Sequence, residues 1–113
     1  MPLRRVSVLL LVFTASLTSC SRVDPLSVTD SPDHTAVLID ALAGNDRLIC
    51  ILPDATKPCG EESSQAVISG VGGSADIDAR WTGSHNVSVT VTNGTLTKSE
   101  TAALGGRVQI AYR

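Results

Sequence analysis

Short runs of β-favouring residues, separated by turn residues, limit the fold of this chain more than any other feature. Beyond Pro32, no stretch of ten or more residues repeats its apolar positions with the 3.6-residue period of an amphipathic helix. The clearest run covers residues 86–92, in which three valines alternate with hydroxyl residues. Such alternation is typical of a strand with one buried and one exposed face.

Applied along the chain, the same criteria predict seven strands. A tight turn at residues 44–46 predicts a hairpin between the first two, and Asn93-Gly94 predicts a type I′ hairpin between the fifth and sixth. The competing interpretation for residues 99–104 is a short helix. Seven strands within residues 34–113 predict an all-β domain, either a small antiparallel β-sandwich or a barrel. The predicted strands cover residues 36–43, 47–52, 65–70, 75–82, 86–92, 95–99 and 107–112.

Trp81 is the one tryptophan of the chain. It shares the apolar side of the fourth predicted strand with Ile77 and Ala79, while Asp78 and Arg80 occupy the polar side. This pattern predicts that Trp81 packs in the core. The alternative is an exposed anchor for a protein partner, because tryptophan is enriched among the residues that dominate binding interfaces.

The first 19 residues have the layout of an export signal. Arg4 and Arg5 precede an apolar run at residues 6–13, and small or polar residues follow up to Cys20. The apolar stretch is too short for a transmembrane helix, which needs about 20 such residues. We therefore predict a signal peptide at residues 1–19 that is cleaved off.

The segment Leu17-Thr18-Ser19-Cys20 resembles the bacterial lipobox, in which an aliphatic residue and two small residues precede an acylated cysteine. The resemblance implies that Cys20 becomes the mature N-terminus and carries a diacylglycerol thioether and usually an amide-linked fatty acid such as palmitate. Each buried methylene contributes about 0.8 kcal/mol, so several acyl chains form a durable membrane anchor. Residues 21–33 are mostly polar residues and proline, and with Cys20 they are predicted to form a lipidated, flexible tether of roughly 20 Å.

The chain contains three cysteines, an odd number for an exported protein. Cys50 and Cys59 are predicted to form a disulfide in an oxidising compartment, and lipidation accounts for Cys20. Closing a loop of about ten residues contributes on the order of 2–3 kcal/mol. A redox or metal-binding pair is the alternative, but the sequence has no CxxC motif and no third ligand nearby.

The mature chain lacks the charge pattern of a nucleic-acid-binding protein. Arg4 and Arg5 leave with the leader, so seven of the nine basic residues remain against eleven acidic ones, with no basic cluster. The two histidines, His34 and His85, fall in predicted loops, and a zinc site needs three or four convergent ligands. No GxSxG motif surrounds any serine. We therefore predict no catalytic residues, no metal site and no cofactor.

The order of motifs in residues 31–113 is similar to that of a group of small bacterial lipoproteins of uncharacterised function. It comprises Ser31-Pro32-Asp33 before a strand, Trp81 before a loop, an alternating strand at 87–91, a glycine turn and a closing strand at 108–112. This resemblance implies no reaction. It does imply the same overall plan, which is a lipid anchor followed by a short β domain.

Together these features predict a membrane-anchored, non-catalytic envelope lipoprotein that acts as a binding or structural module. Its partners would be the membrane, through the lipid on Cys20, and an envelope protein. The lipid would hold it at the cell membrane or outer membrane, with the domain in the periplasm or on the cell exterior. The alternative is a small-ligand carrier, or a periplasmic inhibitor or enzyme, with a cavity between the sheets.

Overall fold

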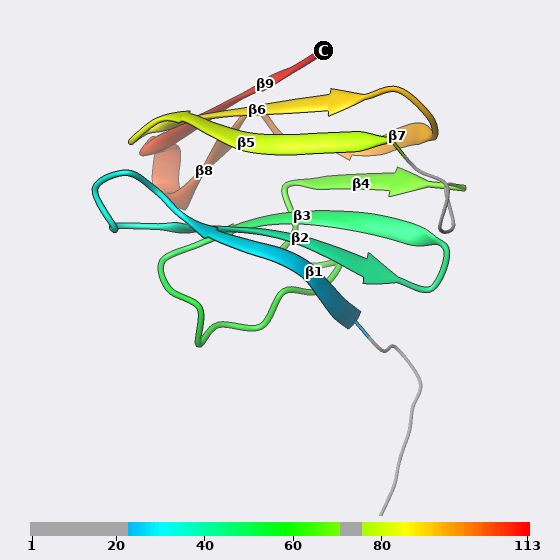
Figure 1. Cartoon of the computed structure of the whole chain (residues 1–113), viewed down its shortest axis with the longest axis horizontal. Coiled ribbons are helices and arrows are strands. Elements are labelled where there is room, and N and C mark those ends of the chain that lie inside the picture. The colour runs from blue at the N-terminus through cyan, green and yellow to red at the C-terminus, as the bar shows by residue number, and fades with distance from the viewer. Residues whose placement is uncertain (1–22, 71–75) are drawn as a thin grey trace, which may run out of the picture.

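The computed structural model describes residues 23–70 and 76–113, which form a sandwich of two packed β-sheets (Figure 1). The predicted all-β sandwich is thus confirmed. The predicted signal peptide at 1–19 and Cys20 lie outside the described residues, as do residues 71–75, which include the start of the strand predicted at 75–82.

All strand pairs of sheet A are antiparallel, and sheet B contains one parallel pair. Sheet A has the strand order β1 (Val23–Asp30), β2 (Val37–Ala43), β3 (Asp46–Leu52), β4 (Ala66–Ser69) and β7 (Thr95–Ser99). Sheet B has the order β5 (Ile77–Gly83), β6 (Asn86–Val91), β9 (Val108–Tyr112) and β8 (Ala102–Ala103). The prediction of a wholly antiparallel sandwich needs one correction, because β6 and β9 run parallel.

The hairpin predicted around residues 44–46 is confirmed. Strands β2 and β3 pair antiparallel without a register shift, from Val37 opposite Leu52 to Ala43 opposite Asp46. Gly44 has a φ of 63°, which a residue without a Cβ adopts at little cost.

The hairpin predicted from Asn93-Gly94 is wrong. Strand β6 lies in sheet B between β5 and β9, so both of its edges are already paired, and β7 lies in sheet A beside β4. The chain therefore crosses from one sheet to the other at this point. A type I′ turn needs positive φ at both central residues, and only Gly94, with a φ of 110°, has one.

The flexible tether predicted for residues 21–33 is wrong for Val23–Asp30, which form strand β1 at the edge of sheet A. Most of its side chains are exposed, so its polar composition does not prevent pairing with β2. Pro25 is tolerated because it lies beside a register shift of an edge strand. The short helix considered for residues 99–104 is also absent, since β8 and a 3-10 turn at Leu104–Gly106 take its place.

The inner core fills the space between the two sheets. Val87 and Val89 of β6 are buried there, and Val108 and Ile110 of β9 share that side, as the alternation predicts. The buried members of this cluster are Ala36, Leu38, Ile49, Ile51, Ala66, Ile68, Val87, Val89, Ala103, Val108 and Ile110.

An ion pair is nearly buried within sheet A. Arg47 of β3 donates two hydrogen bonds to the carboxylate of Asp40 in β2, one from Nε to Oδ1 at 2.9 Å and one from Nη2 to Oδ2. The side chains of Arg47 and Asp40 are only 12% and 10% exposed. Such a two-point contact fixes the guanidinium in one orientation.

Trp81 is partly buried and packs against the inner core, as its place in the alternation predicts. Its indole Nε1 donates a 2.9 Å hydrogen bond to the carbonyl oxygen of Thr29. Because Trp81 belongs to β5 and Thr29 to β1, the bond joins an edge strand of each sheet. Trp81 therefore links the two sheets at one edge of the sandwich.

Replacing Trp81 with phenylalanine is expected to lower the free energy of unfolding by about 1 kcal/mol, because a smaller aromatic ring remains in place while the bond to Thr29 is lost. Urea denaturation followed by circular dichroism measures this loss. Trp81→Ala should cost more, since it also removes packing against the inner core. Equal stability of Trp81→Phe and the wild type would show that the bond contributes nothing.

Candidate binding surface

Sheet A buries apolar side chains on both of its faces. Residues that alternate with those of the inner core form a second cluster on the face directed away from sheet B. Strand β3 is therefore almost continuously buried, as its apolar run at 47–52 predicts for a central strand. The buried members of this outer cluster are Val37, Ile39, Ala41, Leu48, Cys50, Leu52 and Val67.

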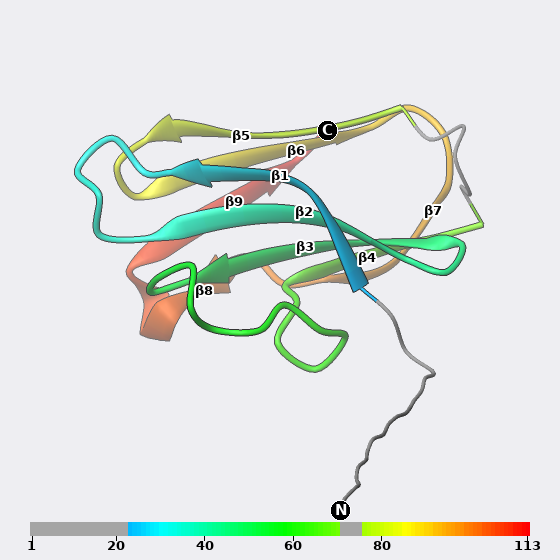
Figure 2. The same cartoon turned by 60° about the horizontal axis from the view of Figure 1, so that its bottom comes forward.

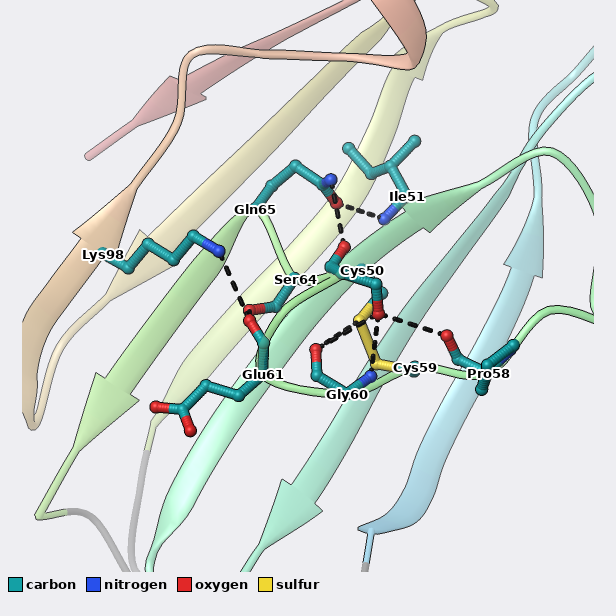
Figure 3. The surroundings of a disulfide bond; sticks show 10 residues. Cys50, Ile51, Pro58, Cys59, Gly60, Glu61, Ser64, Gln65 and Lys98 are labelled. Atoms are coloured by element: carbon teal, nitrogen blue, oxygen red, sulfur yellow. Dashed lines mark hydrogen bonds between the residues drawn. A yellow bond between two sulfur atoms is a disulfide. The ribbon is translucent and has the colours of Figure 1, made fainter.

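The segment that connects β3 to β4, residues 53–65, lies on the outer side of sheet A (Figure 2). It is covalently fixed there, because Cys59 forms a disulfide with Cys50 of β3, with 5.9 Å between the two Cα atoms (Figure 3). The predicted disulfide is thus confirmed. Cys59 is partly buried against the outer cluster, and Cys50 is fully buried within it.

We call residues 53–65 the disulfide loop. Hydrogen bonds hold its second half, which leads into β4 (Figure 3). The side-chain oxygen of Gln65 accepts a 2.6 Å bond from the amide of Ile51, which links the loop to β3. Lys98 of β7 donates a 3.3 Å bond to the carbonyl of Glu61, and the hydroxyl of Ser64 donates to the same carbonyl at 2.7 Å. The loop is therefore tied to two strands of sheet A as well as by the disulfide.

In the first half of the disulfide loop, the side chain of Asp54 stabilises a turn. Its Oδ1 accepts a 2.9 Å bond from the amide of Thr56 and another bond from the Thr56 hydroxyl. These bonds stabilise the charged carboxylate, first through the hydroxyl and then through the amide, and they lower the pKa of Asp54. Asp54 is thus a structural residue of the loop.

A shallow groove of about 310 Å³ runs between strand β1 and the first half of the disulfide loop. Its walls are mainly apolar, and Lys57 is the one charged residue among those that line it. The lining residues are Val23, Pro25, Val28, Ile39, Ala55, Lys57, Pro58 and Cys59. A second groove of about 500 Å³ shares Val23, Pro58 and Cys59 with the first and extends toward Glu61 and Glu62.

Beside this groove, β1 exposes two large apolar side chains. Leu26 and Val28 are each 52% exposed, and they are the large hydrophobic residues that stand out as exposed in the described part of the chain. Val28 lines the groove, and Leu26 lies on the same strand, at the register shift between Pro25 and Ser27. Apolar surface grouped in this way is typical of an interaction site.

The histidines lie elsewhere, in the loops that precede β2 and β6. His34 Nδ1 is 3.4 Å from Asp30 Oδ2, and His85 Nε2 is 3.9 Å from Asp33 Oδ2. Hydrogen bonds from Thr35 and then Ser31 lower the pKa of Asp33 to about 2, so this carboxylate organises its own turn. Across residues 23–70 and 76–113, no three His, Cys, Asp or Glu side chains converge as metal ligands would.

Of the residues singled out from the sequence, the structure brings Cys50 and Cys59 together, places Trp81 on another side of the sandwich and does not describe Cys20. The sequence does not predict the groove, because its composition predicts a tether where β1 lies. Leu26 and Val28 alternate with Ser27 and Thr29, and that short pattern was the available signal for a strand.

The chain matches no protein-family model, and no curated protein or solved structure is significantly similar to it. The resemblance to small bacterial lipoproteins therefore stays a prediction. In the part of the chain that the structure describes, no helix has the length and apolar character needed to span a membrane.

Proposed function

We propose that this protein is an exported lipoprotein, held at an envelope membrane by acyl chains on Cys20. In this proposal the β-sandwich is a non-catalytic module that binds another envelope component or has a structural role. The leader at residues 1–19 is removed when the lipid is attached.

The observation that carries the proposal is the pairing of the cysteines. Two of the three form the disulfide between Cys50 and Cys59, so neither is available to Cys20. The remaining cysteine is the one that follows Leu17-Thr18-Ser19, where the resemblance to the lipobox implies acylation. An exported chain with a disulfide and a separate cysteine at this place agrees with a lipid attachment site.

The described polar side chains support a binding or structural role. Asp33 and Asp54 accept hydrogen bonds within their own turns, and Asp40 is engaged by Arg47. Between the sheets, the inner core occupies the place where a ligand carrier would hold its cargo. The exposed apolar groove on sheet A favours contact with a surface over enclosure of a small molecule.

Acylation can be tested by feeding tagged palmitate to bacterial cells that express the full chain. The wild type should incorporate the tag and enter the detergent phase on phase separation, and Cys20→Ala should lose the tag. Ser21→Ala, a change at the neighbouring residue, serves as the matched control and should remain labelled. Equal labelling of the wild type and Cys20→Ala would refute the proposed anchor.

A further inference from the structure

Strand β1 leaves very little chain between the proposed anchor and the folded domain. Its first residue is Val23, so only residues 21 and 22 separate it from Cys20. Since extended chain spans at most about 3.6 Å per residue, Val23 lies within roughly 11 Å of the residue that bears the lipid, whatever the conformation between them. A domain attached in this way cannot float away from the bilayer.

The side of the domain nearest to this attachment is apolar. Val23 packs against the outer cluster, lines both grooves and begins the strand that carries Leu26 and Val28. Ala55 and Pro58 of the disulfide loop line the same groove. We name this surface the β1 face and define it by Val23, Pro25, Leu26, Val28, Ala55 and Pro58.

We propose that the β1 face docks on the surface of the bilayer that holds the lipid anchor, with zwitterionic phospholipid as its occupant. This inference rests on the proposed function, because it needs a membrane attachment at residue 20. Leu26 and Val28 enter the boundary between headgroups and acyl chains, and Lys57 contacts the phosphates.

The charges around the β1 face favour zwitterionic over anionic lipid. Asp30 belongs to the same strand, and Glu61 and Glu62 lie along the second groove. Among the residues that line the two grooves, Lys57 is the single cation against Glu61 and Glu62, and this excess of carboxylates opposes a negatively charged surface.

Docking depends on the attachment of residue 20 to the bilayer. Two half-exposed side chains cannot hold a free domain on a membrane, because they bury too little apolar area to offset the loss of rotational and translational freedom. Once residue 20 is fixed in the bilayer, docking becomes an intramolecular event at a high effective concentration. The β1 face is thus expected to insert only in the anchored protein.

The test places a single tryptophan on either side of the sandwich. Val28→Trp reports on the β1 face, and Thr82→Trp is the matched control on the exposed side of β5, with Trp81→Phe in both. The full chain is reconstituted in phosphatidylcholine vesicles whose acyl chains are brominated, because bromine quenches nearby indoles. If mass spectrometry finds a free thiol at Cys20, the same chain is coupled there to a maleimide phospholipid, so docking is tested even when acylation fails.

We expect several-fold stronger quenching at residue 28 than at residue 82, and weaker quenching at residue 28 when equally brominated phosphatidylglycerol replaces part of the phosphatidylcholine. Equal quenching at the two positions in an anchored protein overturns the docking face. Quenching that grows with phosphatidylglycerol overturns the assignment to zwitterionic lipid. A different outcome is a dimer, found by sedimentation without vesicles, in which residue 28 is shielded from solvent. That result would show that a second copy of the chain covers the β1 face, and it would also overturn the proposal.

Discussion

Arg47→Met is expected to lower the free energy of unfolding by about 3–5 kcal/mol, because it leaves the carboxylate of Asp40 nearly buried without its partner. Urea denaturation at neutral pH, followed by circular dichroism, measures the loss. The midpoint should fall while the slope stays unchanged, since the surface exposed on unfolding is almost the same.

A matched control exists on the exposed side of β5. Arg80 contacts Asp78, but their side chains are 67% and 50% exposed, so Arg80→Met should lower the stability far less than Arg47→Met. The double variant Asp40→Leu/Arg47→Met should recover most of the loss, because no unpaired charge remains buried. A cost for Arg47→Met as small as that for Arg80→Met would show that the pair is not effectively buried.

Removing the disulfide with Cys50→Ala/Cys59→Ala is expected to lower the free energy of unfolding by about 2–3 kcal/mol, because the unfolded chain is no longer constrained by the closed loop. The disulfide loop should also become sensitive to limited proteolysis while the strands stay intact. Both effects follow from the same bond, which holds residues 53–65 over the outer cluster.

Two controls distinguish the effect of the disulfide bond from the effect of removing the sulfur atoms. Reducing the wild type should reproduce the stability of the double variant, and Cys20→Ser should leave both stability and protease resistance unchanged. If the double variant resists the protease as the wild type does, the hydrogen bonds of Gln65 and Lys98 are sufficient to hold the loop.

The strands with clear alternation or a continuous apolar run could be predicted from the sequence. The alternation of Val87 and Val89, the buried run of β3 and the pairing of Cys50 with Cys59 all agree with the structure. Each of these depends on local pattern or on the small number of cysteines. Local pattern is informative where a side chain has one strongly preferred environment.

What could not be predicted depends on pairing between distant strands. Asn93-Gly94 has the chemistry of a hairpin turn, but β9 occupies the edge of β6 that a hairpin partner would need. Likewise, β1 forms because β2 offers a free edge, and an edge strand with exposed side chains needs little apolar content. The groove beside Val28 could not be predicted for the same reason, since it exists only where β1 meets the disulfide loop.

Whether residue 20 carries lipid can be read from the mass of the N-terminal peptide of protein purified from membranes. We expect a chain that begins at Cys20, with a mass increased by a diacylglycerol on the sulfur. An unmodified thiol at Cys20, or a leader of residues 1–19 still attached, would contradict it.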